Sequence, residues 1–149
     1  MDSKGLKASW IIVLIVNCIA VIIGLTIMIA PEVFMISEYE GYTGKNWADF
    51  ISSNPDAAAF LRLESTQMGW YLFTLGVVGI IITILLYKKG NKQSWYILLV
   101  LIIMGVGGSL GYDLPTGIPQ LIMMVALFLV IGLIGLAIGA KPILKGSSA

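Results

Sequence analysis

Three polar side chains in one short stretch of the sequence have types and spacing that suit ligand binding. Glu64, Gln67 and Tyr71 recur at intervals of three and four residues, which places them on one face of a helix. A carboxylate, an amide and a phenol on one face can bind a cation or a lipid head group. The alternative is ordinary polarity at a membrane surface, with Glu64 in solvent or paired with Arg62 or Lys45.

A second pair with similar chemistry, Tyr112 and Asp113, lies in the turn 111–119. If this turn lies beside Glu64, two carboxylates approach each other, which raises the pKa of one and allows acid–base chemistry or cation binding. The alternative is that Asp113 ends a helix and organises a tight turn, a common role for aspartate. We therefore expect a candidate binding site, with no catalytic residue, made of Glu64, Gln67, Tyr71, Tyr112 and Asp113.

Residue types that hold metals and cofactors are nearly absent. The chain has no histidine and a single cysteine, Cys18, inside an apolar run. The common zinc and iron–sulfur ligand sets are therefore missing, and a disulfide within the chain is excluded. There is also no basic patch with interleaved aromatic residues, so nucleic-acid binding is not expected. The sequence predicts no metal and no cofactor.

The composition is that of a membrane protein. Hydrophobic residues make up 58% of the 149 residues and charged residues 11%, whereas a soluble domain has about 25% charged residues. Four apolar stretches qualify, or nearly qualify, for the ~20 residues that a membrane-spanning helix needs. They cover residues 8–30, 69–87, 95–111 and 118–140. Because backbone hydrogen bonds must close within each span, we expect one all-α domain, 1–149, built as a four-helix transmembrane bundle.

The basic residues predict the orientation of the spans. Seven of the nine precede span one, lie between spans two and three, or follow span four, with Asp2 as the only acid among them. The opposite side carries seven acids with Lys45 and Arg62, so the two sides have net charges of +6 and −5. The positive-inside rule then places both termini in the cytoplasm. No organelle signal is visible, so we expect an integral protein of a prokaryotic plasma membrane.

The segment 31–68 is the main extramembrane region, on the outer side. Residues 38–45 have the glycine and polar content of a loop. Trp47, Phe50 and Ile51 then recur at helical spacing. They predict a short amphipathic helix that lies on the membrane surface.

A long helix is predicted to follow. Asn54 is a suitable cap, and Pro55 suits the first helical turn. We expect this helix to continue through span two to about residue 87. About 33 residues at 1.5 Å each reach ~50 Å, which exceeds the ~30 Å hydrocarbon core, so the first turns project from the outer face.

Small residues recur at helical intervals inside the spans, and such spacing lets helix backbones approach closely. Asn17 lies in span one, where its amide must find a partner. A hydrogen bond to another helix is the ordinary explanation, and a place in the lining of a substrate path is the alternative. The residues that we expect at helix–helix contacts are Asn17, Gly24, Gly76, Gly107, Gly111, Gly132, Gly135 and Gly139. A surface for a partner protein is the second explanation for the glycines.

The stretch Phe60-Leu-Arg-Leu, followed by Gly69-Trp-Tyr-Leu-Phe-Thr-Leu-Gly76, resembles the second helix of small four-helix membrane proteins of the DoxX-like kind. The turn 111–119 is similar to the turn between helices three and four in related uncharacterised families. The resemblance covers the four-span layout. It implies a four-helix bundle with an accessory place in a membrane redox or oxidase complex, although no cofactor ligand carries over. Claudin-like and tetraspanin-like families rely on cysteines in the outer segment, which has none here.

These features lead to two main hypotheses of function. The first is a structural or accessory subunit of a larger membrane assembly, in contact with the lipid bilayer and with other membrane subunits or further copies of the chain. The second is an outward-facing membrane protein that binds a lipid or a small molecule, with an enzymatic role left open. A transporter ranks third, because charges inside the spans, which usually mark ion routes, are missing.

Overall fold

The computed structural model describes residues 4–144. Within this range the chain forms helices and no strand, which confirms the expected all-α class. In chain order the elements are α1 Lys4–Ile29, α2 Glu32–Thr43, α3 Trp47–Ser53, α4 Pro55–Leu85, η1 Tyr87–Lys89, α5 Lys92–Leu101, η2 Ile102–Val106, α6 Gly107–Asp113, η3 Leu114–Thr116 and α7 Pro119–Leu144. The elements η1 and η3 are short 3-10 helices, and η2 is a π-helical turn.

Four helical segments are long and apolar enough to cross a membrane. They are Lys4–Ile29, Pro55–Lys89, Lys92–Thr116 and Pro119–Leu144. These segments agree with the four predicted spans, although the third continues to Thr116 instead of ending near residue 111. The chain is therefore an integral membrane protein with a four-helix bundle, as its composition predicts.

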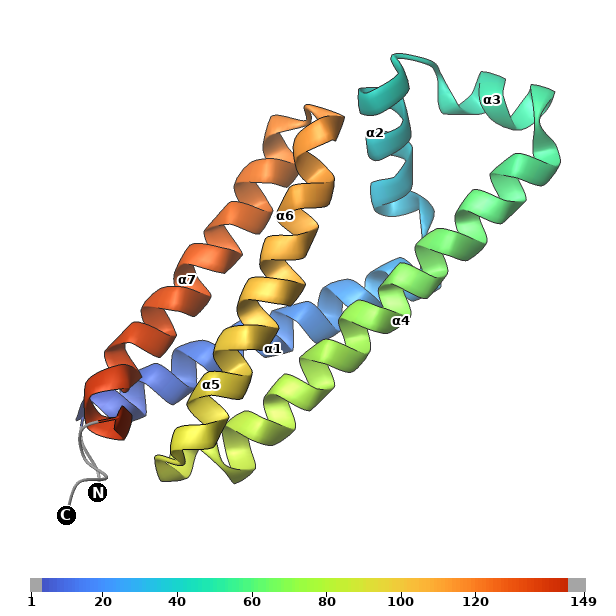
Figure 1. Cartoon of the computed structure of the whole chain (residues 1–149). Helices are drawn as coiled ribbons and strands as arrows, with labels where there is room; N and C mark the ends of the chain where they lie inside the picture. The colour runs from blue at the N-terminus through green and yellow to red at the C-terminus, as the bar shows by residue number, and fades with distance from the viewer. Residues whose placement is uncertain (1–3, 145–149) are drawn as a thin grey trace.

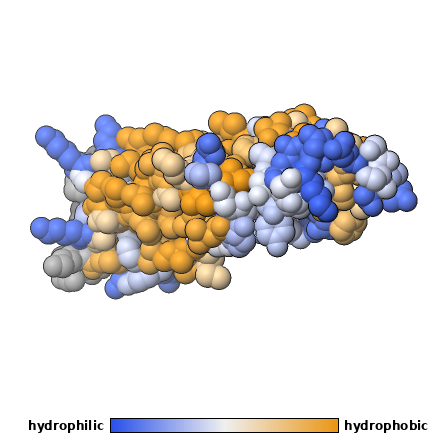
Figure 2. Space-filling model, turned by 90° about the horizontal axis from the view of Figure 1, so that it is seen from above, coloured by the Kyte–Doolittle hydropathy of each residue, from blue (hydrophilic) through white to orange (hydrophobic). Residues whose placement is uncertain are grey.

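The bundle carries opposite charge at its two ends. In Figure 1, α1 begins, α7 ends and α4 turns into α5 at the same end of the molecule. This lysine end holds Lys4, Lys7, Lys88, Lys89, Lys92 and Lys141, whereas Asp2 and Lys145 lie outside the described residues. The acidic end consists of α2, α3, η3 and the first turns of α4. Figure 2 shows an apolar band between the two hydrophilic ends, as expected for a surface in contact with lipid.

Helices α1 and α4 form the closest pair in the bundle, and glycines permit their approach. A Cβ atom on Gly24 would lie 2.5 Å from the backbone nitrogen of Phe73. A Cβ atom on Gly76 would lie 2.9 Å from the carbonyl oxygen of Asn17. Backbone atoms cannot move aside without shifting a whole helix, so these positions exclude any larger residue at the present helix separation.

Helix α7 packs against α1 through a buried polar group near the lysine end. The Ser9 hydroxyl donates a hydrogen bond to the carbonyl oxygen of Gly135 at 2.6 Å. Its oxygen lies 2.6 Å from the Tyr87 hydroxyl, which therefore acts as the donor to Ser9. A Cβ atom on Gly139 would collide with Tyr87, and one on Gly135 would lie 2.8 Å from a methyl group of Ile12. Two of the predicted packing glycines thus lie where α7 contacts its neighbours.

Span three is not a uniform α-helix. The π-helical turn η2 separates α5 from α6, and the backbone N–H of Gly107 bonds to the carbonyl of Ile102, five residues earlier. Ile102 is buried, and its side chain would lie 3.1 Å from a Cβ atom on Gly132 of α7. π-helical turns are rare and frequently lie at functional sites. Apolar residues and glycines are equally compatible with an α-helix here, so the sequence did not predict this turn.

The acidic end is more helical than the sequence predicts. Residues 38–45 were expected as a loop, but most of them belong to α2, which ends at Thr43 and is followed by Gly44 with a φ of 67°. The short helix expected around Trp47 is present as α3. Trp47 is only 4% exposed, and its ring contacts those of Tyr39, edge to face, and Phe50 at centroid distances of 5.2 and 5.4 Å. The apolar face of α3 therefore packs on α2 and on the first turns of α4.

Helix α4 runs unbroken from Pro55 to Leu85, as expected. Its 31 residues span ~46 Å, so its first turns extend beyond a ~30 Å hydrocarbon core. Asn54 precedes the helix, but its side chain makes no capping hydrogen bond, which corrects that part of the prediction. Asn46 instead caps α3, since its side chain accepts a hydrogen bond from the backbone N–H of Ala48 at 2.9 Å.

Candidate functional site

Gln67 and Tyr71 contact each other on α4. The Gln67 side-chain nitrogen donates to the Tyr71 hydroxyl at 2.6 Å, one helical turn away. Glu64 lies on the same face, and all three side chains are exposed, Tyr71 by 57%. This part of the predicted site is an open polar face and not a pocket wall.

Asp113 lies in a different environment from its neighbour Tyr112. Asp113 is 7% exposed, whereas Tyr112 is 58% exposed. The Thr116 hydroxyl donates to the backbone carbonyl of Asp113 at 2.7 Å, and Gly117 then reverses the chain with a φ of 66°. This contact uses the backbone of Asp113 and not its side chain, so both interpretations of the aspartate stay predictions. Its carboxylate, however, receives no hydrogen bond or ion pair from residues 4–144.

The acidic residue of α2 whose pKa responds to the charge of Asp113 is Glu38. A Cβ atom on Gly41, one turn from Glu38, would collide with Ile118 and lie 3.5 Å from the carbonyl oxygen of Thr116. Helix α2 is thus packed against the turn after α6, and Glu38 projects from the same face. Burial raises the pKa of Glu38 above its ordinary value, and the charge of Asp113 raises this pKa further. The sequence predicted Glu64 as the carboxylate near Asp113. It did not predict Glu38, because residues 38–45 resemble a loop.

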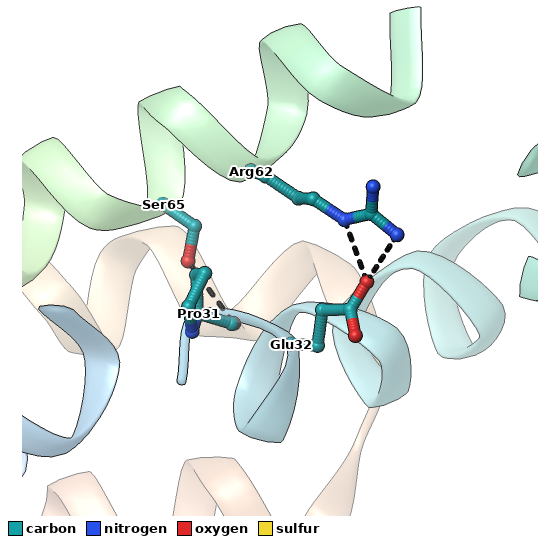
Figure 3. A network of polar contacts seen from close by, with 4 residues as sticks. All are labelled: Pro31, Glu32, Arg62 and Ser65. Carbon is teal, nitrogen blue, oxygen red and sulfur yellow. Dashed lines mark hydrogen bonds and ion pairs between the residues drawn. The ribbon is translucent and has the colours of Figure 1, made fainter. Parts of the chain in front are cut away.

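An ion pair anchors α2 to α4 (Figure 3). The Nε and Nη2 atoms of Arg62 lie 2.6 and 2.5 Å from one carboxylate oxygen of Glu32. Nearby, the Ser65 hydroxyl donates to the carbonyl oxygen of Pro31 at 3.3 Å. Both members of the ion pair are 41% exposed, so solvent screens it and it stabilises the fold by roughly 1 kcal/mol at most. Arg62 is thereby engaged with Glu32 and not with Glu64.

A cavity of about 100 Å³ lies between the four spans, in the half of the bundle nearer the acidic end. Its walls come from α1, α4, η2, α6 and α7, and all but one of the lining residues are apolar. These residues are Val16, Ile19, Ala20, Ile23, Leu72, Val106, Ser109, Met124, Val125 and Phe128. The cavity is partly open, and Ser109 in its lining is exposed. Its own hydroxyl donates to the carbonyl of Gly105 at 3.1 Å, so the lining offers little polarity.

Asp113 lies beyond this cavity on the same face of span three. Val106 and Ser109 line the cavity, and Asp113 follows Ser109 by four residues and Val106 by seven. Residues at these intervals share a helix face, so the backbone of Asp113 lies about 6 Å along the axis from that of Ser109, toward the acidic end. Asp113 therefore lies between the cavity and the acidic end of the molecule, and neither Asp113 nor Glu38 lines the cavity.

Asn17 belongs to the α1–α4 contact and not to the cavity lining. Its side-chain nitrogen donates to the carbonyl of Val13 at 2.8 Å, within the same helix. Among residues 4–144, the expected hydrogen bond from Asn17 to another helix is not made. The Asn17 amide instead packs on Gly79 of α4, where a Cβ atom would collide with it.

Three glycines of α6 face open space. A Cβ atom added at Gly107, Gly108 or Gly111 would meet no atom within 4 Å in the described part of the chain. The close helix contact expected at Gly107 and Gly111 is therefore absent within residues 4–144. At this open face of α6, the glycine spacing does not correspond to packing among residues 4–144.

Within residues 4–144, no group of three or more histidine, cysteine, aspartate or glutamate side chains could hold a metal ion. No protein-family model matches the sequence, and neither a curated protein nor a solved structure matches it.

Proposed function

We propose that the protein binds an amphiphile, either a lipid or an apolar small molecule with a polar head, in the cavity beside Asp113. The positive-inside rule places the acidic end outside, so the ligand would enter from the outer leaflet. The observation that carries the proposal is an apolar cavity lined by all four spans, with the acidic residue Asp113 one helical turn beyond Ser109 of its lining.

The size and surroundings of the cavity support this function. A dry apolar cavity of about 150 Å³ accepts a benzene-sized group, so a cavity of about 100 Å³ has room for a short part of an apolar chain. The open side leaves space for the remainder of the chain to extend into lipid. The π-helical turn also contributes Val106 to the wall, and such turns are frequent at functional sites.

Photo-crosslinking tests the proposal. A single-chain alcohol that carries a diazirine in its tail is irradiated with the purified protein in detergent, and the labelled peptides are mapped by mass spectrometry. We expect labelling of α6 and the first half of α7. Val125→Trp should abolish it by filling the cavity, and Leu127→Trp is the matched control, because Leu127 is exposed on the same helix. Equal labelling of both variants would contradict the proposal.

A second candidate function is that of a subunit in a larger membrane assembly. The open glycine face of α6 favours it, because small residues allow a helix of another chain to approach closely. Purification in mild detergent tests this function. A partner or a second copy should remain bound to the unchanged protein and should be lost with Gly108→Leu. A monomer that is equally well behaved with and without this substitution would contradict it.

A further inference from the structure

We propose that the lysine end of the bundle binds anionic phospholipids, with Lys7 and Lys88, both beside Trp10, as the main contacts for the lipid phosphate. This inference does not use the cavity, so it is independent of the proposed function. It adds a second binding surface at the opposite end of the molecule and names the chemistry of its partner.

The first observation is the uncompensated positive charge of the lysine end. All of the lysines that define it are exposed, and within residues 4–144 none of them is in an ion pair. The acidic residues of the described chain lie in the segment 32–64 or at Asp113, toward the opposite end. Helices α1 and α5 begin at the lysine end and α4 and α7 end there (Figure 1), so their terminal dipoles largely cancel. The ammonium groups therefore determine the local potential, which attracts anions.

The second observation is that buried contacts hold the lysine-bearing segments together. The Tyr87 hydroxyl of η1 and the Ser9 hydroxyl of α1 are hydrogen-bonded at 2.6 Å, and both residues are 0% exposed. A Cβ atom on Gly139 of α7 would collide with both side chains. Each of these three residues lies within two positions of a lysine. The lysines of α1, η1 and α7 therefore surround one fixed point of the fold.

The third observation is the position of Trp10. The Lys88 Nζ atom lies 4.8 Å from the centroid of the Trp10 ring, and Lys7 precedes Trp10 by three residues, on the same face of α1. Tryptophan side chains prefer the level of the lipid head groups. The indole of Trp95 lies at this end as well, where its N–H donates to the carbonyl oxygen of Leu136 at 2.9 Å. The two ammonium groups are therefore at the depth of lipid phosphates.

The shape of this end favours a lipid over a soluble partner. Lys4 and Lys92 are the first residues of α1 and α5, and Lys141 lies in the last turn of α7. The connection between α4 and α5 is only residues 86–91. In the described part of the chain, the charges thus lie at the ends of the spans and not on a projecting segment. A lysine at a membrane surface favours anionic lipid by about fivefold.

Photo-crosslinking in vesicles tests the inference, because a lipid on an exposed surface exchanges with detergent. The protein is placed in phosphatidylcholine vesicles with a trace of photoreactive phosphatidylglycerol or phosphatidylcholine, each with a diazirine near the glycerol. We expect the phosphatidylglycerol to label residues 4–10 and 86–95 about twentyfold more strongly, the product of two such lysines. Lys7→Gln combined with Lys88→Gln should remove most of this preference. The same pair of changes to arginine keeps the charge and should retain it.

Two controls keep the test decisive. Lys45→Gln removes the same charge at the acidic end, where Lys45 is exposed, and should change nothing. High salt should weaken the preference in the unmodified chain, which needs no variant to fold. Equal labelling by the two lipids, or a full preference in the double glutamine variant, would overturn the inference. So would displacement of the phosphatidylglycerol by poly-glutamate at equal charge, because the surface would then suit a soluble acidic partner. Labelling of α6 and α7, which reports on the cavity, is read separately.

Discussion

At the scale of single residues, the acidic end holds two acidic residues, Glu38 and Asp113, that are partly or largely buried. Glu38 is half-buried on α2, and its raised pKa means that the folded protein keeps a proton on it more readily than the unfolded chain does. Asp113 and Tyr112 are the titratable neighbours that face it. Asp113 could be selected from the sequence because an acid in a proline- and glycine-rich turn stands out. Glu38 could not be selected from the sequence, because its position depends on α2. The glycines in this segment led to the prediction of a loop there.

The raised pKa predicts how Glu38→Gln changes stability with pH. Below the unfolded-state pKa of about 4.3, both states are protonated and the substitution has little effect. As the pH rises through the folded-state pKa, the unfolded chain binds fewer protons than the folded one, so the unmodified protein loses stability. We expect the glutamine variant to unfold about 2 °C higher at pH 7 and at the same temperature near pH 4. Thermal unfolding in detergent measures this, and a lower unfolding temperature at pH 7 would contradict it.

At the scale of elements, glycine spacing alone does not reveal which glycines pack. The same kind of pattern lies in α1, α4, α6 and α7, but only in α6 does the glycine face remain open. Helix boundaries were more predictable, since Pro55 begins α4 and no breaker interrupts it before Leu85. The π-helical turn and the length of α2 were not predictable, because both depend on contacts with distant parts of the chain.

A matched pair of substitutions tests the difference between closed and open glycines. Gly24→Ala places a Cβ atom 2.5 Å from the Phe73 backbone nitrogen, and we expect it to destabilise the fold by about 1–3 kcal/mol. Gly108→Ala meets nothing within 4 Å, and we expect it to be neutral or to stabilise the fold by up to ~1 kcal/mol through helix propensity. Unfolding in denaturant compares the two variants. Similar effects at both positions would show that α1 and α4 do not approach each other as described.

At the scale of the whole molecule, composition and charge already predict the class. Four apolar stretches with few charges predict a helical membrane bundle, because backbone hydrogen bonds in lipid must close within each helix. This part of the fold therefore followed from the sequence. The cavity did not, because it depends on how the side chains of all four spans fit together. The alignment of an apolar cavity with an acidic end is likewise a property of the assembled bundle.

The predicted orientation can be tested in intact cells. An amine-reactive reagent that does not cross membranes should label Lys45, which is exposed at the acidic end, and should leave Lys89 unlabelled until the cells are opened. The reverse pattern would place the acidic end inside. The ligand would then have to come from the inner leaflet.

Native mass spectrometry of the detergent-purified protein tests the central claim, ligand occupancy of the cavity, most directly. The unmodified chain should carry one bound amphiphile, Leu127→Trp should carry the same one, and Val125→Trp should carry none. If Val125→Trp retains the same bound mass as the unmodified chain, the cavity is not the binding site.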